Sequence, residues 1–146
     1  MKYVIRLLAA VGTVVFLAVG AVSPSLAATS LPRINTLGIG TWSDGIWSVR
    51  PHLVAFGANF EIKRLYYQHY NQTDAYGHGR LVLTTCRPNC NEGAYTVRAS
   101  AYFYGTRHHV GIGPYYGHLR LRWRHNHKSH SMLLWIGKRG RWDWRG

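Results

Sequence analysis

The sequence YTVRASAYFY, from Tyr95 to Tyr104, is the most regular stretch of the chain. Apolar and polar side chains alternate along it. Because successive side chains of a β-strand point to opposite faces, this alternation predicts a strand with one buried face. The predicted inward positions are Tyr95, Val97, Ala99, Ala101 and Phe103, and the predicted outward positions are Thr96, Arg98, Ser100, Tyr102 and Tyr104. We therefore expect one face of this strand to belong to the core and the other to contact water.

Similar stretches lie on both sides of this strand. We predict further strands at residues 46–49, 52–56, 60–70, 81–86, 118–124 and 132–136. Residues 60–70 could be scored as a helix, but their tyrosines favour a pleated surface and no capping residue precedes them. With about seven short strands and no convincing helix, the pattern predicts an all-β fold, a single small antiparallel β-sandwich or barrel.

The segments between these strands are rich in turn-forming residues. Residues 75–79 have glycine at every second position after Ala75 and are predicted to form a tight turn. Residues 105–117 contain several glycines and Pro114, and we predict an exposed loop there. Residues 125–131 are predicted to turn the chain back toward the last strand.

The two ends of the chain differ from the middle. Lys2 and Arg6 precede an apolar run that ends in small residues before Ala27, a pattern typical of a cleaved secretory signal peptide over residues 1–27. The apolar run is shorter than the roughly 20 residues of a spanning helix, so we expect no integral membrane span after cleavage and an extracellular, secreted product. The rest divides into an irregular N-terminal segment (28–45), a β-rich domain (46–137) and a basic aromatic C-terminal tail (138–146) without periodicity.

Cys86 and Cys90 are the two cysteines of the chain. An even number of cysteines in an exported protein predicts a structural disulfide, here closing the bend at Pro88 and Asn89. A redox pair would need an exposed, activated thiolate in a two-residue spacing, and a zinc site would need four ligands. The predicted disulfide would fix a local turn.

An aromatic run, a glycine pattern and the CRPNC sequence together form a recognisable motif. Its residues are Leu65, Tyr67, Tyr70, Ala75, Gly77, Gly79, Cys86 to Cys90 and Gly93. From residue 42 to residue 97 the chain resembles a family of small secreted actinobacterial proteins whose members are uncharacterised. Tyr67 and Tyr70 stand where that family often has tryptophan. Thr84 and Thr85 stand where it often has Asn-Asp. The resemblance implies a secreted β-rich domain of actinobacterial origin and implies no activity.

The chain is strongly basic. Without the predicted signal peptide it has 16 Lys and Arg against 5 Asp and Glu, a net charge of +11. Guanidinium groups bind phosphates and carboxylates, and aromatic rings stack on sugars or bases. We therefore predict binding of an anionic extracellular polymer or cell-envelope surface, such as a teichoic polymer, extracellular DNA or anionic lipid headgroups. A solvated face that protects a strand edge is the alternative. The predicted binding residues are Arg98, Arg120, Arg122, Arg124, Arg141, Trp142, Trp144 and Arg145.

Catalysis is not indicated by the sequence. The few acidic residues offer no evident pair for acid–base work, and Asp74 and His78 have no nucleophile on a strained turn beside them. We expect a non-catalytic protein without a cofactor or a small-molecule substrate. Export, small size and cationic aromatic character also suit a bacteriocin-like or toxin protein. A histidine-based metal site is a further alternative, with His118, His125, His127 and His130 as candidate ligands.

Overall fold

The structure is a computed structural model that describes residues 30–37, 41–57, 60–85 and 93–144. It is all-β, with a seven-stranded antiparallel sheet that nearly closes into a barrel and a separate two-stranded sheet. The predicted fold class is confirmed. The predicted signal peptide (1–27) and the predicted Cys86–Cys90 disulfide lie outside the described residues. The described part of the chain contains no helix suited to crossing a membrane.

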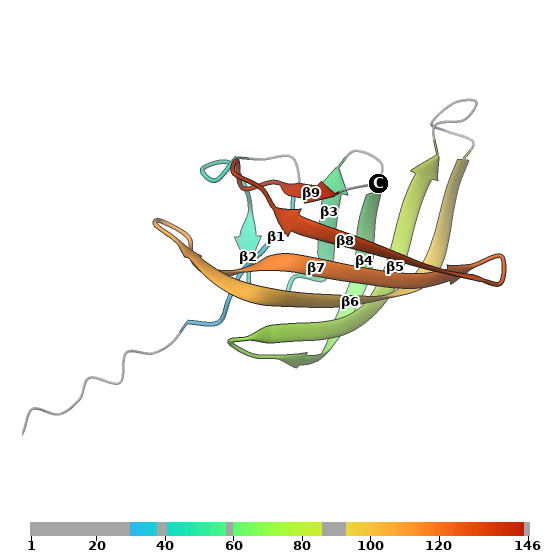
Figure 1. The fold of residues 1–146 in the computed structure, drawn as a ribbon, viewed down its shortest axis with the longest axis horizontal. Helices are drawn as coiled ribbons and strands as arrows, with labels where there is room; N and C mark the ends of the chain where they lie inside the picture. Colours follow the sequence, from blue (N-terminus) through green and yellow to red (C-terminus); the bar gives the residue numbers. More distant parts are fainter. Residues whose placement is uncertain (1–29, 38–40, 58–59, 86–92, 145–146) are drawn as a thin grey trace, which may run out of the picture.

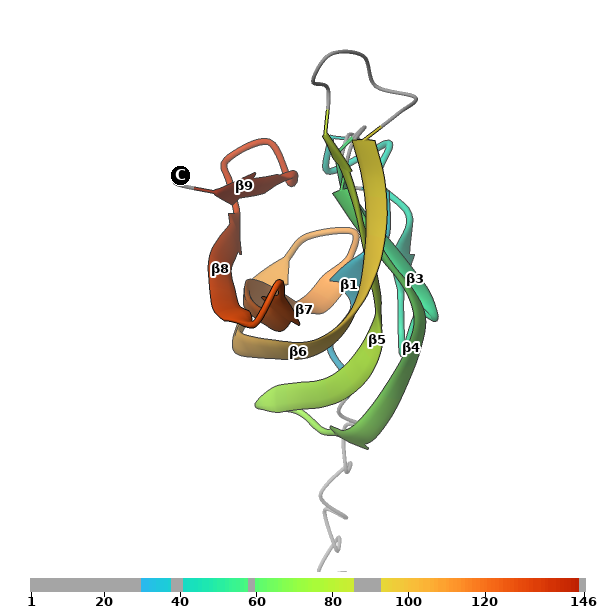
Figure 2. The same ribbon diagram turned by 90° about the vertical axis from the view of Figure 1, so that its right-hand side faces the viewer.

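Consecutive strands of the large sheet are hydrogen-bonded neighbours, so the sheet is a chain of hairpins. Its strands are β3 (Leu53–Gly57), β4 (Phe60–Tyr70), β5 (Asp74–Thr85), β6 (Gly93–His109), β7 (Gly113–His125), β8 (Lys128–Ile136) and β9 (Trp142–Trp144). The small sheet pairs β1 (Ile34–Asn35) with β2 (Trp47–Ser48). The large sheet is strongly curved, and its edge strands β3 and β9 approach each other (Figures 1 and 2).

The interior of the curved sheet is apolar, and the alternation of β6 explains why. The side chains of Ala99, Ala101 and Phe103 are buried, whereas Arg98 on the opposite face of the strand is exposed, as the sequence predicts. On β7 the same holds for Leu119 and Leu121, whose side chains are fully buried. Because two long strands alternate in register, one face of each supplies the core and the other is free for a surface function.

Residues 105–117 are not the loop that the sequence predicts. β6 and β7 continue their pairing to His109 and Gly113, and the connection is only residues 110–112. Pro114 is opposite His108 near the start of β7, where a missing N–H is tolerated, and its carbonyl accepts a hydrogen bond from the Arg33 N–H at 2.9 Å. Glycine and proline here shape a long hairpin and do not end it.

The predicted turn at residues 75–79 is part of strand β5. The opposite strand β4 is irregular between Lys63 and Tyr66, with Arg64 at a positive φ of 52°. This brings the backbone of β4 very close to β5: a Cβ placed on Gly77 would lie 2.5 Å from the Tyr66 carbonyl oxygen. The glycines of this segment therefore permit close contact between two strands at a bulge, which is a second common reason for glycine inside a strand.

The turn between β7 and β8 is shorter than predicted. Asn126 and His127 alone form it, with φ values of 50° and 61°, and His125 already pairs with Lys128. Two consecutive positive φ values are the geometry of a type I′ turn, whose twist matches that of the strands it joins. β7 and β8 therefore run side by side to the tip of the hairpin (Figure 1).

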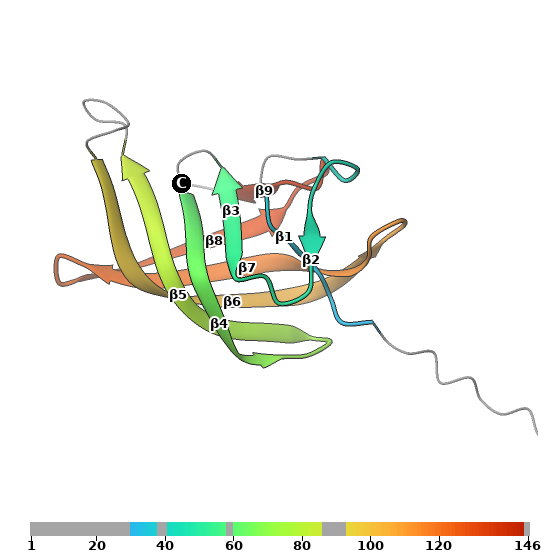
Figure 3. The same ribbon diagram turned by 180° about the vertical axis from the view of Figure 1, so that it is seen from behind.

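Both chain ends are more ordered than the sequence predicts. The segment 28–45, predicted to be irregular, contains β1, and Ile34 and Asn35 are fully buried. The tail contains β9, which pairs with β8. Asn35 joins the two ends: its Nδ2 donates to the Gly140 carbonyl at 2.7 Å, and Trp142 Nε1 donates to the Asn35 carbonyl at 3.0 Å. β1 and β2 lie beside β3 (Figure 3), where the Ala55 N–H donates to the Thr36 carbonyl.

Candidate functional site

Outward side chains of neighbouring strands come together in rows across the large sheet. Arg80 of β5 is opposite Arg98 of β6. Ser100 and Tyr102 of β6 are opposite Arg122 and Arg120 of β7. Residues directly opposite each other in an antiparallel pair stand on the same face. The strand register thus gathers the predicted arginines of β6 and β7 on one surface.

These arginines line a groove with a volume of about 1040 Å³, here called the arginine groove. Its arginines are Arg64, Arg80, Arg98, Arg122 and Arg124, and no aspartate or glutamate lines it. The other lining residues are Tyr76, His78, Gly79, Val97, Ala99, Ser100, Trp123, Ser129, His130 and Ser131.

The groove lies where two hairpins separate. β6 pairs with β5 from Gly93 onward, but with β7 only from Ala99, which is opposite Trp123. Beyond these residues the β5–β6 hairpin and the β7–β8 hairpin point in different directions (Figure 1). Residues around this point on β6, β7 and β8 line the groove.

The positive charge of the groove is not neutralised within the described residues. The ion pairs found there join Lys63 to Glu61 and His69 to Asp74, and neither includes an arginine of the groove. Arg80 and Arg98 are instead directly opposite each other, and like charges in this position are destabilising. A bound anion would remove this repulsion, so the arrangement suits an anionic ligand.

A smaller hollow of about 240 Å³ adjoins the groove, and we call it the tyrosine niche. It is lined by His69, Tyr76, Ser100, Tyr102, Arg120 and Arg122, and it shares Tyr76, Ser100 and Arg122 with the groove. The Tyr76 ring stacks on His69 with 6.0 Å between ring centroids, and the Tyr102 ring stacks on Tyr104 at 5.3 Å. The Tyr76 ring is therefore supported by another residue of the niche, His69, and the Tyr102 ring by Tyr104, which does not line the niche.

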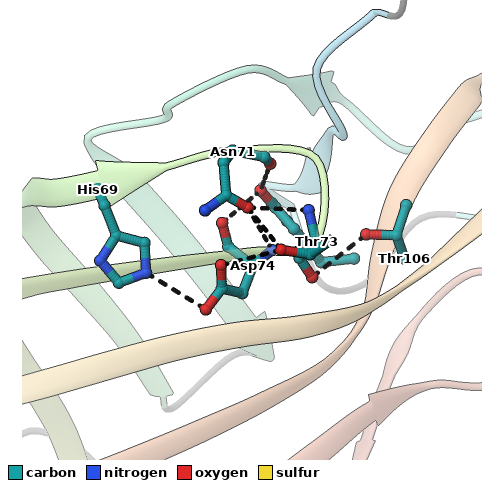
Figure 4. A network of polar contacts seen from close by, with 6 residues as sticks. His69, Asn71, Thr73, Asp74 and Thr106 are labelled. Atoms are coloured by element: carbon teal, nitrogen blue, oxygen red, sulfur yellow. Dashed lines mark hydrogen bonds and ion pairs between the residues drawn. The ribbon is translucent and has the colours of Figure 1, made fainter.

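Asp74, at the β4–β5 turn, contacts two residues of the niche: it lies beside His69 (Figure 4) and forms a hydrogen bond with Tyr102. Asn71 Oδ1 accepts hydrogen bonds from the N–H groups of Thr73 and Asp74, both at 2.9 Å, which fixes the turn. Asp74 Oδ2 lies 3.4 Å from His69 Nε2. Partial burial alone would raise the pKa of the Asp74 carboxyl, but hydrogen bonds from Asn71, Tyr102 and His69 outweigh burial and lower the pKa. The hydrogen bond to Asp74 also raises the pKa of Tyr102.

Asp74→Asn is expected to destabilise the protein in a pH-dependent way. Because the folded-state pKa of Asp74 is lowered, its stabilising effect is present above the unfolded-state value and is lost as the pH falls through the folded value. We expect wild type to exceed the variant by about 1 kcal/mol in unfolding free energy at pH 7, and by clearly less at pH 3. Urea unfolding at both pH values measures this difference. Asp143→Asn, at an exposed position, is the control; a constant difference for Asp74→Asn would contradict the prediction.

The tail residues lie elsewhere, and the side chain of Trp142 belongs to the core. Its side chain is 2% exposed and packs against Phe56 and Phe103, because β9 turns this face toward the core. Arg141 and Trp144 border a separate hollow of about 590 Å³ that shares no lining residue with the arginine groove. Arg145 lies outside the described residues. The tail and the strand arginines therefore do not form one site.

Three of the four candidate metal ligands lie against aromatic rings. His118 stacks on Tyr104, His125 on Tyr95 and His130 on Trp123. Burial, followed by the charge of Arg107, lowers the pKa of His118. In an extended segment His125 and His127 would share a face, but a tight turn with positive φ at Asn126 and His127 stands in place of an extended segment. Within the described ranges no three His, Cys, Asp or Glu side chains are grouped to hold a metal ion.

The sequence reasoning missed several residues of this surface. Tyr76, His78 and Arg80 are outward residues of β5 that line the arginine groove. They alternate with Ala75, Gly77, Gly79 and Leu81, so a period-two pattern was present and was hidden by the two glycines.

No protein-family model, curated protein or solved structure matches the chain. What this surface can do therefore follows from its own chemistry: many donors and positive charges, and rings beside them.

Proposed function

We propose that this chain is an exported, non-catalytic β-domain that binds an anionic polymer of the extracellular space or the cell envelope through the arginine groove. The observation that carries the proposal is a groove lined by five arginines and no acidic residue. The signal-peptide pattern of residues 1–27 and the resemblance to secreted actinobacterial proteins support export.

The size and spacing of the charges favour a polymer over a single small anion. Arg122 and Arg124 are two residues apart on β7, which corresponds to about 6.7 Å along a strand. Arg98 and Arg80 extend the positive surface across β6 to β5. One phosphate group can occupy one or two guanidinium groups, whereas a chain of phosphates places a negative charge at each step. A polymer therefore satisfies the whole groove.

The test compares two triple variants with equal loss of charge. Arg98→Gln, Arg122→Gln and Arg124→Gln remove groove charge, while Lys138→Gln, Arg139→Gln and Arg141→Gln remove charge around the separate tail hollow. The probe is a chain of inorganic polyphosphate, with binding followed by calorimetry between 50 and 300 mM salt. In this range of salt concentration, contacts with phosphates make the affinity strongly salt-dependent.

For wild type we expect log affinity to fall linearly with log salt concentration. The groove variant is expected to bind at least about 10-fold more weakly at low salt, with a slope reduced by about 2, because each lost phosphate contact contributes about 0.7. The tail variant is expected to stay within about 3-fold of wild type on the same grounds. No binding by wild type at low salt, or equal losses in both variants, would overturn the proposal.

A further inference from the structure

The outward face carries aromatic rings and positive charges in neighbouring rows. His69, Tyr76, Tyr102 and Arg120 are opposite one another across β4, β5, β6 and β7. The next row along the strands holds Tyr66, His78, Ser100 and Arg122, and the row after it pairs Arg80 with Arg98. A row of aromatic rings therefore lies beside rows of guanidinium groups on one continuous surface.

We propose that the polymer bound in the arginine groove is single-stranded nucleic acid, with a base entering the tyrosine niche. This inference rests on the proposed function, since it identifies the ligand of the same site. A nucleic acid single strand is an anionic chain that carries planar rings along one side. Proteins that bind such strands combine a basic groove with aromatic side chains on which bases stack.

The niche has the groups that a base requires. Tyr76 and Tyr102 border it, while Tyr104, which stacks on Tyr102, does not line it. The hydroxyl of Ser100 and the guanidinium groups of Arg120 and Arg122 supply hydrogen-bond donors. Carbonyl oxygens on the edge of thymine or guanine are acceptors that such donors recognise.

Polymers without rings would leave the niche unused, and a duplex cannot reach it. A polyphosphate or glycerol-phosphate chain offers charges to the arginines but nothing to Tyr76 and Tyr102. In a double helix the bases are stacked and paired, so entry of a base would require its extrusion. A strand with exposed bases offers phosphates to the rows of charge and planar rings to Tyr76 and Tyr102.

The experiment separates the contribution of the bases from that of the phosphates. The full chain without its signal segment is titrated with a 15-nucleotide oligothymidine, an abasic strand with the same number of phosphates, and a duplex of equal length, all at one salt concentration. Oligothymidine is expected to bind at least about 5-fold more tightly than the abasic strand, the lower end of the effect of stacking one base. This comparison uses only the wild-type protein.

Ring variants then locate the effect. Tyr76→Leu and Tyr102→Leu are expected to abolish the preference for oligothymidine while leaving the affinity for the abasic strand within about 2-fold, because the arginines remain. Tyr66→Leu is the matched control, since Tyr66 is 73% exposed on β4 and lines neither the niche nor the groove.

The outcomes also distinguish this inference from the proposed function. Equal binding of oligothymidine and the abasic strand, equal binding of the duplex, or tighter binding of a sulfated glycan such as heparin would overturn the nucleic-acid inference and leave polyanion binding intact. No binding of either strand or of polyphosphate at low salt would overturn both.

Discussion

Trp142→Ala is expected to lower the free energy of unfolding by about 3–5 kcal/mol, the usual loss when a buried tryptophan is truncated. The indole is almost fully buried and contacts Phe56 and Phe103 in the core. Its removal also takes away the hydrogen bond from Nε1 to the Asn35 carbonyl, which is buried and would be left without that donor. The loss of packing and the loss of the hydrogen bond act in the same direction.

Trp144→Ala is the matched control for this prediction. Trp144 lies two residues further along β9, and its side chain is 50% exposed. We expect Trp144→Ala to lower the free energy of unfolding by less than about 1 kcal/mol, as is usual for surface substitutions. Denaturant unfolding followed by circular dichroism measures both variants. Equal losses of unfolding free energy in the two variants would contradict the placement of Trp142 in the core.

Gly77→Ala is expected to destabilise the protein by about 3 kcal/mol, the upper end of the usual cost of overpacking. The added methyl group would lie 2.5 Å from the Tyr66 carbonyl oxygen and 3.2 Å from the Tyr67 Cα, and backbone atoms cannot rotate away. The bulged strand β4 would have to move off β5, and the register that places Tyr76 beside Tyr102 would be disturbed.

Gly57→Ala provides the comparison for Gly77→Ala. Among the residues that the structure describes, a methyl group on Gly57 would meet the Trp144 ring at 3.9 Å, an ordinary contact. We expect little change in stability there, within about 0.5 kcal/mol. Thermal unfolding of the two variants checks the pair. A Gly77→Ala protein as stable as Gly57→Ala would show that the close approach of β4 to β5 is not required.

Much of the sheet could be predicted because its strands alternate strictly. Tyr95 to Tyr104 show the pattern most clearly, and the inward and outward faces of this stretch are as predicted. Residues 118–124 alternate between exposed arginines and more buried apolar residues in the same way. Glycine misled the prediction at Gly77 and Gly113, where it serves strand contact and hairpin geometry. β1 is only two residues long, too short for any periodicity, and its burial depends on contacts with distant parts of the chain.

The candidate site was predictable only within single strands. Alternation on β6 predicts that Arg98 points outward, which the structure confirms, and Arg120 and Arg122 on β7 are exposed as well. Their grouping with Arg80 depends on the register between β5 and β6, and a pattern within one strand does not contain that register. The C-terminal tail (138–146) was assigned to the same site only because it is rich in basic and aromatic residues. Pairing of β9 with β8 carries it to another part of the surface.

The hydrogen bonds of Asn35 have a consequence for the order of folding. The hairpins of the large sheet form between neighbours in the chain, so they need little loop closure. The Asn35 side chain, in contrast, is bonded to Gly140, 105 residues away, and both groups are buried. A nascent chain can therefore assemble its hairpins early. It cannot complete its core until Gly140 and Trp142 have been synthesised, and this long-range closure is expected to be the slow step of folding.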